Sequence, residues 1–474
     1  MSDGAAKLLS ELLPGLPPAH PFHEAYNRLT ARTDNWTSGQ WMTERAGVSD
    51  VQNTETWATY SPLHQKTGPN GRLDEGDYLV SGFKFFSSAT DAEITILLAK
   101  TETGNLSAFL APLTKTIIDS NGKPKVVTNG IRIHRLKTKL GTKQLPTAEL
   151  ELKDVRAYLV GPLDRGVSTI SHILNVTRAH ACMGSVAGWR RCLSIAKNFS
   201  RERSVWGTRL GELPLHLRTL SEMELKVRGS MHLTFFTIAL MSFTENGFPV
   251  AVDSPLPKEG VEARVVLRTL TATSKAVITK TASRGIQECM EALGGVGYID
   301  DPDEPENIAR AFRDSNVNSI WEGTTNVLSS EVVRNLLKND HVEVFSGWVN
   351  RAVHSIRGEE LRDALGNSWH NLHRRLMTGS FDLLGDGRRI MFSLAWLIIG
   401  MLLAVDAQRD NDQVATELAR RWVLNGESGM GEWLLPDVGG VSAKAQFHEG
   451  KERARWDYSI VWGDNSGRLG QSKI

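Results

Sequence analysis

The residues best suited to chemistry lie in one short run, Val317–Asn326, with the sequence VNSIWEGTTN. It places a single acid, Glu322, between the large aromatic Trp321 and a flexible Gly-Thr-Thr turn. A carboxylate held against apolar surface has a raised pKa and can act as a base near neutral pH. The alternative is a helix cap, because polar side chains here can bond the first amides of a helix over 327–337. The candidates for that cap are Thr324, Thr325 and Asn326. Both interpretations can hold together, and the motif alone does not separate them.

Two earlier clusters could contact a flat, polar ligand. The loop Trp41–Asp50, WMTERAGVSD, carries hydroxyls at Thr43 and Ser49, which with backbone amides could hold a planar, amide-rich heterocycle. The run Gly82–Ser88, GFKFFSS, alternates so that one face of a strand combines an aromatic with a hydroxyl donor. The side chains on that face are Lys84, Phe86 and Ser88. The ordinary alternatives are a turn for the loop and a core aromatic for the strand.

Two later clusters could approach a phosphate or a ligand edge. The run Arg201–Leu210, RERSVWGTRL, ends a long helix with arginines and turns at Gly207. Arginine forks suit phosphate oxygens, although exposed arginines at helix ends are the commoner case. The run Leu293–Tyr298, LGGVGY, is a glycine-rich turn that lets the backbone approach a ligand. It is not the nucleotide-binding GxGxxG motif, because it follows a helix and no βαβ unit surrounds it.

The elements that must position these clusters change character near Gly166. Residues 1–40 hold short helical pieces broken by prolines and predict a frayed remainder rather than a domain. Residues 41–165 predict a compact, mostly antiparallel β domain, because short alternating or apolar runs are separated by turn residues. Its expected strands lie at 77–88, 93–100, 106–113, 130–136 and 148–160. Residues 166–340 predict an α-helical bundle, because the apolar period becomes helical. Its expected helices lie at 167–203, 217–245, 261–293 and 329–338.

The region 341–474 predicts further helices and then a Gly-rich loop from Asn425. These helices are expected at 348–378, 389–408 and 412–423. From Glu331 to Ile474 the sequence has 18 Lys and Arg against 19 Asp and Glu. A duplex-binding face would show a basic excess, so nucleic-acid binding is not expected.

Composition describes a soluble globular protein of two or three domains, with 474 residues and a formal charge of +1. The three cysteines have no metal or disulfide spacing, which fits a reducing compartment, and no metal site is expected. They are Cys182, Cys192 and Cys289. The apolar run Met391–Val405 is shorter than the about 20 residues of a membrane span and predicts a buried core helix. The terminal Ser472–Ile474 is one conservative change from the S-K-L signal, which suggests a peroxisomal location with a cytoplasmic one as the alternative.

The order of these motifs resembles the acyl-CoA dehydrogenase flavoprotein family, and within it the AidB-like branch. MTERAGVSDVQNT at Met42–Thr54 resembles the flavin-contacting loop of that branch, and GFKFFSS resembles the strand that faces the isoalloxazine. RERSVWG resembles the R-x-x-F-G turn of the family, while EALGGVGY followed by NSIWEGTTN is the most specific part. The resemblance covers about residues 7–337. It implies an α+β fold in which an antiparallel β-barrel precedes a C-terminal helical bundle that holds the flavin and acyl site.

The resemblance implies that Glu322 abstracts the α-proton of an acyl-CoA thioester while hydride leaves the β-carbon for N5 of FAD. The thioester carbonyl would be polarised by the amide of the base residue and a flavin ribityl hydroxyl. Some relatives carry the base on an earlier helix, before an arginine; Thr177 precedes Arg178 here, which leaves Glu322 as the candidate. The implied FAD contacts are Met42, Thr43, Ser49, Phe86, Ser88, Arg203, Gly294, Gly295, Thr324 and Thr325. The implied substrate contacts are Arg178, Trp321 and Gly323.

The sequence departs from the family pattern most clearly at its start. Members carry an N-terminal helical domain that forms one wall of the acyl pocket, whereas 41 residues precede Met42 here, so this domain is expected to be largely absent. Its loss would open the site to water and weaken retention of flavin and acyl group. The alternative function is therefore a weakly active or inactive flavin and fatty-acyl-binding protein. By resemblance the protein forms a dimer or tetramer in which Arg203 reaches a flavin across the subunit boundary, and its electron acceptor is an electron-transfer flavoprotein or oxygen.

Overall fold

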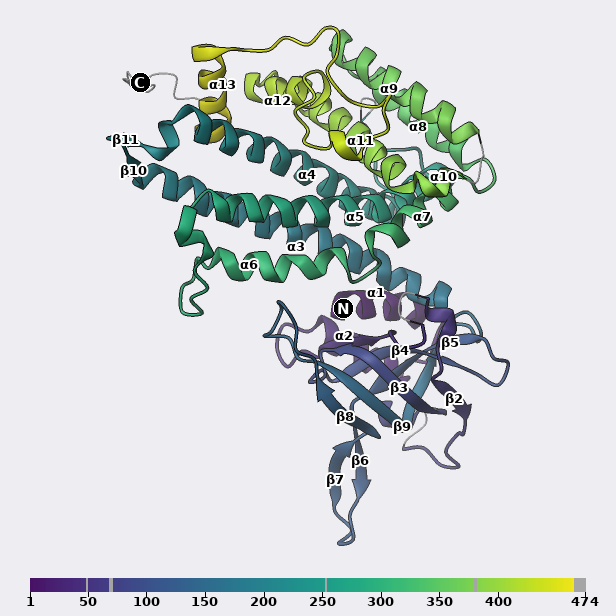
Figure 1. Cartoon of the computed structure of the whole chain (residues 1–474). Coiled ribbons are helices and arrows are strands. Elements are labelled where there is room, and N and C mark those ends of the chain that lie inside the picture. The colour runs from purple at the N-terminus through teal and green to yellow at the C-terminus, as the bar shows by residue number, and fades with distance from the viewer. Residues whose placement is uncertain (48–49, 68–70, 252–253, 379–381, 464–474) are drawn as a thin grey trace. The chain divides into compact units, whose positions relative to one another are not determined.

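The computed structural model describes residues 1–47, 50–67, 71–251, 254–378 and 382–463. The chain divides into two compact units, Met1–Thr177 and Arg178–Ile474 (Figure 1). The first unit contains a β-barrel with two short helices, and the second is entirely helical apart from one two-stranded ribbon. Ser49 and the terminal Ser472–Ile474 lie outside the described residues.

The barrel of the first unit closes through five strands. Strand β4 (Ile94–Lys100) pairs with β2 (Trp57–Tyr60), and the path continues through β3 (Tyr78–Ser88) and β9 (Thr147–Val160) to β5 (Leu106–Pro112), which pairs again with β4. Strand β8 (Ile131–Leu136) adds to β9. The expected strands are confirmed, and the sheet is mostly antiparallel as predicted, with two parallel pairings. Strand β1 (Ser38–Trp41) runs parallel to β4, and β2 meets β4 in parallel at one residue pair.

The two sides of β4 pack against different partners. Alternate side chains Ile94, Ile96 and Leu98 join the core beneath α1 (Ser2–Leu12) and α2 (Pro21–Thr30). Leu97 and Ala99 point the other way and join a second cluster of barrel side chains. Because both faces are covered, β4 is buried from Ile94 to Ala99, and Thr95 is the one polar residue of this stretch. The first helices therefore belong to the core of this unit and are not frayed.

A separate hairpin extends from the barrel and is made of β6 (Thr114–Ile118) and β7 (Pro124–Thr128) (Figure 1). Its strands pair only with each other. The sequence did not predict this hairpin, because its mixed charged and apolar residues do not form a clear alternating run.

The second unit is built on three long helices that lie side by side, α3 (Gly166–Glu202, in this unit from Arg178), α4 (Pro214–Asn246) and α5 (Val261–Glu291) (Figure 1). All three were predicted within a few residues. The shorter α6 (Ile308–Ser315) was not predicted, while α7 (Thr325–Leu336) begins four residues before its expected start. Helix α7 packs against α5, and this contact sets the position of the turn that carries Glu322.

The C-terminal region of this unit differs from its prediction in two places. The single helix expected at 348–378 is two, α8 (His341–His354) and α9 (Glu359–Met377), because Gly358 begins a new helix after a break. The expected loop after Asn425 contains α13 (Gly450–Trp462). The remaining helices are α10 (Asp382–Gly385), α11 (Gly387–Asp410) and α12 (Gln413–Val423).

Helix α11 is the apolar run that the sequence assigned to the core. The helix has 24 residues and its most apolar window of 18 residues has a mean hydropathy of 2.2, so it is long and apolar enough to cross a membrane and the length argument was wrong. However, 89% of its most apolar window is buried inside the protein, against α4, α5, α7, α9 and α12. This burial is typical of a core helix.

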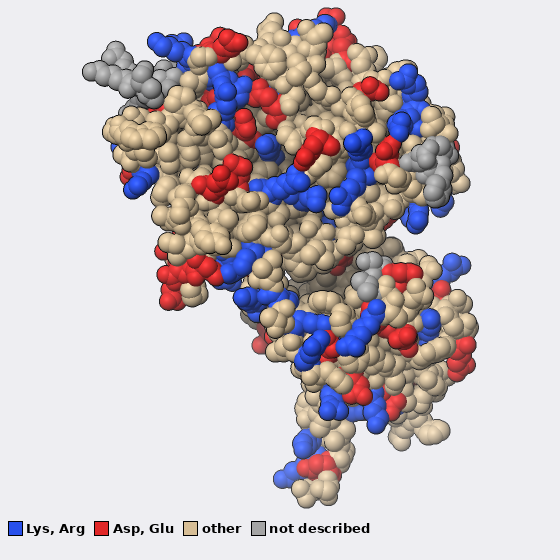
Figure 2. Space-filling view, in the orientation of Figure 1, with Lys and Arg blue, Asp and Glu red and all other residues tan. Residues whose placement is uncertain are grey.

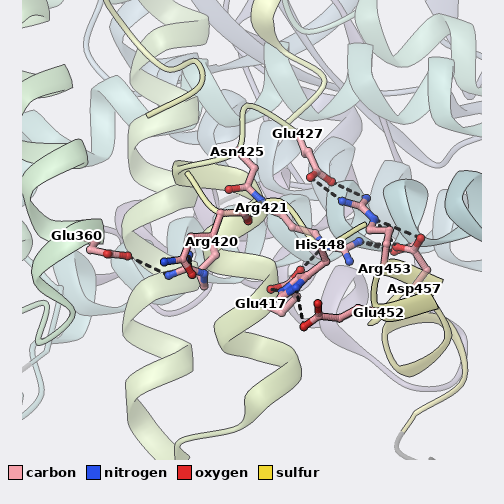
Figure 3. Close-up of polar contacts among 12 residues, drawn as sticks. Glu360, Glu417, Arg420, Arg421, Asn425, Glu427, His448, Glu452, Arg453 and Asp457 are labelled. Atoms are coloured by element: carbon pink, nitrogen blue, oxygen red, sulfur yellow. Dashed lines mark hydrogen bonds and ion pairs between the residues drawn. The ribbon is translucent and has the colours of Figure 1, made fainter. Parts of the chain in front are cut away.

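Helix α13 is joined to the unit by a buried ion network (Figure 3). Arg421 of α12 donates to Glu417 at 2.7 Å and to Asp457 of α13 at 2.6 Å. Arg453 of α13 bonds both oxygens of Glu427 at 2.8 Å. Such pairs specify how α13 packs, because each buried charge requires its partner.

Charges on the visible face of the helical unit are mixed in sign, with Lys and Arg interspersed among Asp and Glu (Figure 2). This agrees with the near-equal counts in the C-terminal sequence.

Candidate active site

The expected base lies in a tight turn between two helical segments. A 3-10 turn, Asn316–Ser319, leads to Glu322, whose φ of 57° is left-handed, and then to Gly323 with a φ of 102°. Left-handed backbone is unfavourable for a residue with a side chain, so the surrounding structure must impose it. Functional sites are enriched in such strained residues.

The helix-cap interpretation predicts the position of Thr324 correctly but not its hydrogen bonding. Thr324 is extended at the N-cap of α7, and Thr325 is the first helical residue and is buried. In this described segment the side chain of Thr324 makes no capping hydrogen bond.

A buried lysine of α5 contacts the turn on both sides of Glu322. Lys275 is 0% exposed, and its Nζ donates to the carbonyl oxygen of Trp321 at 2.5 Å and to that of Gly323 at 2.6 Å. Burial lowers the pKa of Lys275 to about 8, while the charge of Glu322 opposes this shift. The electrostatic coupling indicates that the ammonium and the Glu322 carboxylate are close.

Arg178 lies near this lysine but is paired elsewhere. Its Nη1 and Nη2 bond the two oxygens of Glu331 on α7 at 3.0 and 2.8 Å. Its positive charge contributes to lowering the pKa of Lys275. The Arg178 Nε is buried and has no acceptor among the described residues. That N–H is consequently a buried donor that could serve a ligand.

The other expected phosphate and flavin contacts of this unit lie on exposed turns. Arg203 follows the end of α3 and is exposed, and Trp206 in the same turn is 91% exposed. Gly294 and Gly295 are exposed, and a Cβ on either would meet no heavy atom within 4 Å. The backbone of this glycine turn is open to a ligand.

In the first unit, the loop with Met42 and Thr43 lies beside the strand that carries Phe86 and Ser88. Thr43 accepts a hydrogen bond at its carbonyl from the Phe85 amide at 2.9 Å, so the loop that contains Met42 lies beside β3. Ser88 shares a 2.8 Å hydrogen bond with Thr147. Phe86 is 49% exposed, and Lys137 Nζ lies 4.6 Å from its ring centre.

The predicted alternation along β3 is wrong. Lys84 is fully buried and donates to Glu44 at 2.6 Å, whereas Phe86 is half exposed. A register shift between Lys84 and Ser87 breaks the period of two, because a bulge places extra residues opposite the partner strand. Glu44 also accepts from the Thr56 hydroxyl at 2.6 Å. Glu44, the acid of the run Met42–Glu44, thus holds the loop from inside the barrel.

Sequence reasoning missed the residues that support the site, chiefly Lys275, Glu331, Glu44 and Thr56. One signal could have indicated Lys275, because it is the only charged residue of the run TLTATSKAVIT, which is otherwise apolar or hydroxylated. A charge at such a position requires a buried partner. Among the described residues, no group of three or more His, Cys, Asp or Glu side chains could hold a metal ion.

This fold and the order of its motifs define a member of the acyl-CoA dehydrogenase family, to which the chain belongs. Residues 39–155 match the family model described as acyl-CoA dehydrogenase, middle domain, and residues 164–337 match the C-terminal domain. The family prediction is confirmed.

Particular relatives agree with this assignment. The chain is 39% identical to acyl-CoA dehydrogenase family member 11 of Caenorhabditis elegans, over 78% of this chain and 54% of the relative. It is 33% identical to the putative acyl-CoA dehydrogenase AidB of Escherichia coli, over 81% of this chain and 65% of the relative. The crystal structure of Caenorhabditis elegans ACDH-11 in complex with C11-CoA superposes with a TM-score of 0.76 at 34% identity, covering 89% of this chain and 70% of that one. The chain thus spans roughly half to two thirds of these two curated relatives.

Proposed function

We propose that this chain catalyses FAD-dependent α,β-dehydrogenation of an acyl-CoA thioester, with Glu322 as the base. The observation that carries the proposal is the left-handed Glu322, held between Trp321 and Gly323 directly before α7. Family membership supplies the reaction class, and the turn supplies a carboxylate in an enforced conformation.

The residues fit the cofactor that the family uses. The open backbone at Gly294 and Gly295 and the exposed ring of Phe86 are compatible with a flat, extended ligand. The residues that would hold FAD are Met42, Thr43, Phe86, Ser88, Arg203, Gly294, Gly295, Thr324 and Thr325, with Ser49 a further candidate outside the described residues. When bound, FAD supplies the acceptor for the hydride.

Glu322 would take the α-proton of the acyl group. The proton is weakly acidic, so the thioester carbonyl must be polarised by hydrogen-bond donors. The backbone N–H of Glu322 is one such donor by family resemblance. The apolar body of Trp321, which is 38% exposed, would exclude water from one side of the acyl chain.

Arg178 and Gly323 would contact the substrate near the base. The unpaired Nε–H of Arg178 supports this role, because a buried donor requires an acceptor that the described residues do not provide. The complex of ACDH-11 with C11-CoA supports an acyl-CoA ligand for this chain.

An absorption experiment tests the proposal. The purified protein should be yellow, and anaerobic addition of an acyl-CoA series centred on C11-CoA should bleach the flavin band. Glu322→Gln should retain the flavin and bind the same acyl-CoA without bleaching. A yellow wild-type protein that binds acyl-CoA but is bleached by none would favour the binding-only function instead.

The partners follow from the same proposal. We expect an electron-transfer flavoprotein or oxygen to reoxidise the enzyme, and a dimer or tetramer in which Arg203 serves a neighbouring subunit. Stopped-flow reoxidation with each acceptor and light scattering of the purified protein test these two points.

A further inference from the structure

The conformation of Glu322 requires an explanation that the reaction itself does not give. A left-handed residue with a side chain costs roughly 1–2 kcal/mol relative to ordinary helical backbone. Glu322 adopts it at φ 57°, and Gly323 follows at φ 102°. Two consecutive residues with positive φ persist only where the surroundings hold them.

Lys275 provides that restraint from α5. Its Nζ is bonded to the two carbonyl oxygens that flank Glu322, at 2.5 and 2.6 Å. An ammonium has three N–H groups and no acceptor. Two of these three donors are used in the bonds to the turn. Because Lys275 is completely buried, water does not compete for them.

The opposite side of the turn is fixed by packing. A Cβ on Gly323 would lie 2.9 Å from Cδ2 of Leu328, so the backbone is close to the first turns of α7. Upstream, the Asn318 amide donates to Ser185 of α3 at 3.1 Å. The turn is therefore attached to α3, α5 and α7, and the α5 attachment is made by a charged group bonded to the residues on both sides of Glu322.

Burying that charge is costly, which argues that it has a purpose. An isolated buried ammonium costs several kcal/mol, and two carbonyl oxygens alone do not neutralise it. The compensating charge is Glu322, since its carboxylate favours the protonated lysine. A methionine of similar length would fill the same space without this cost.

We infer that Lys275 is a positioning residue for the reaction: it holds Glu322 in its left-handed conformation through hydrogen bonds to the two flanking carbonyls. This inference rests on the proposed role of Glu322 as the base. Lys275 itself takes no proton from the substrate in this scheme.

The test compares Lys275→Met with Lys275→Arg, which keeps the charge, and with Lys280→Met as the matched control. Lys280 belongs to the same helix and makes no bond to the turn within the described residues. The first measurement is hydrogen exchange in the segment Val317–Leu328, followed by mass spectrometry. Hydrogen exchange should be about tenfold faster in Lys275→Met, because the bonds that hold the strained turn are lost; a tenfold change corresponds to about 1.4 kcal/mol. Exchange should be unchanged in Lys280→Met.

The second measurement separates positioning from folding. Lys275→Met should slow flavin bleaching at saturating acyl-CoA by about a hundredfold, as expected for misplacement of the base, with acyl-CoA affinity changed less than about threefold. Lys275→Arg should recover part of the rate. In a Glu322→Gln background, Lys275→Met should cause no further loss.

The outcomes distinguish this inference from the proposed function. If wild type shows no bleaching, the proposed function fails, while the exchange measurement still tests the restraint on the turn. Unchanged exchange in the turn of Lys275→Met, or faster exchange with an unchanged bleaching rate, would overturn the inference. Should Lys275→Met not fold, Lys275→Leu carries the same test, because it also removes the charge and all three donors.

Discussion

Arg178 on α3 and Glu331 on α7 form a two-point ion pair, with Nη1–Oε1 and Nη2–Oε2 distances of 3.0 and 2.8 Å. The arginine side chain is 9% exposed and the glutamate 28%. This geometry orients the guanidinium, and its buried Nε–H has no acceptor among the described residues.

Loss of Glu331 should therefore affect both stability and substrate binding. Glu331→Gln leaves the Arg178 charge without its partner, and we expect a loss of about 1–3 kcal/mol in the free energy of unfolding. Acyl-CoA affinity should fall as Arg178 turns away. Urea unfolding and acyl-CoA titration measure the two effects. The control is Asp314→Asn, which breaks an exposed pair with Arg310 and should cost less than about 1 kcal/mol. A Glu331→Gln protein as stable as the control would show that the pair contributes nothing.

The pKa of Lys275 predicts opposite pH trends for stability and activity. Burial lowers it to about 8, from an ordinary value near 10.4. Between these values the unfolded chain binds the proton that the folded chain has lost, so the free energy of unfolding should rise with pH. The gain relative to Lys275→Met should reach about 3 kcal/mol over this window.

Activity should fall over the same pH window, because neutral Lys275 no longer favours an ionised Glu322. The charged groups facing Lys275 are Glu322, Arg178 and Cys182, and burial raises the pKa of Cys182 to about 12, so this thiol stays neutral. The rate of flavin bleaching against pH should show a descending limb near pH 8 that moves upward in Lys275→Arg. If the descending limb lies at the same pH in wild type and in Lys275→Arg, Lys275 does not cause it.

Much of the fold could be predicted because its signals are local. The long helices α3, α4 and α5 have apolar periods without internal proline, and the strands β3, β4, β5, β8 and β9 are bounded by turn residues. The parallel pairing of β1 with β4 could not be predicted, since it joins segments 56 residues apart through backbone bonds alone. Helix α13 was missed because its amphipathic signal is weak and its position depends on ion pairs with α12.

The sequence predicted residues of the site only where they belong to a recognisable motif. Glu322 and the glycine turn stand out in the sequence, but the residues that hold them, Lys275 and Glu331, come from other helices. The position of Lys84 also depended on a feature that the sequence does not show, the bulge in β3. Such partners follow from tertiary packing, which no local period specifies.

Substitutions at two glycines of the LGGVGY run should separate structural from ligand-binding roles. A Cβ on Gly297 would lie 2.0 Å from the carbonyl oxygen of Met290, so Gly297→Ala should cost more than about 2 kcal/mol in unfolding free energy. Gly295 has open space, and Gly295→Val should leave stability within about 1 kcal/mol of wild type while reducing the FAD content of the purified protein. Thermal unfolding without flavin and the absorbance of bound flavin are the measurements. Normal flavin content in Gly295→Val would place the cofactor elsewhere.

The buried network of α12 and α13 should control how the C-terminal helix docks (Figure 3). Arg421 is 1% exposed and lies between Glu417 and Asp457, so Arg421→Met leaves two buried carboxylates without this partner. We expect a loss of about 3–5 kcal/mol in the free energy of unfolding.

Release of α13 should also expose its contacts with α3 and α4. The Trp462 ring lies 4.4 Å from the guanidinium carbon of Arg201, and Arg228 donates to the carbonyl oxygen of Ile460 at 3.4 Å. Limited proteolysis should therefore cut Arg421→Met within 450–462 faster than wild type. The control is Arg409→Met, because Arg409 is 71% exposed and its surface pairs with Asp406 and Asp410 should contribute little to stability. If Arg421→Met matches this control in both stability and cleavage, the network does not hold α13 in place.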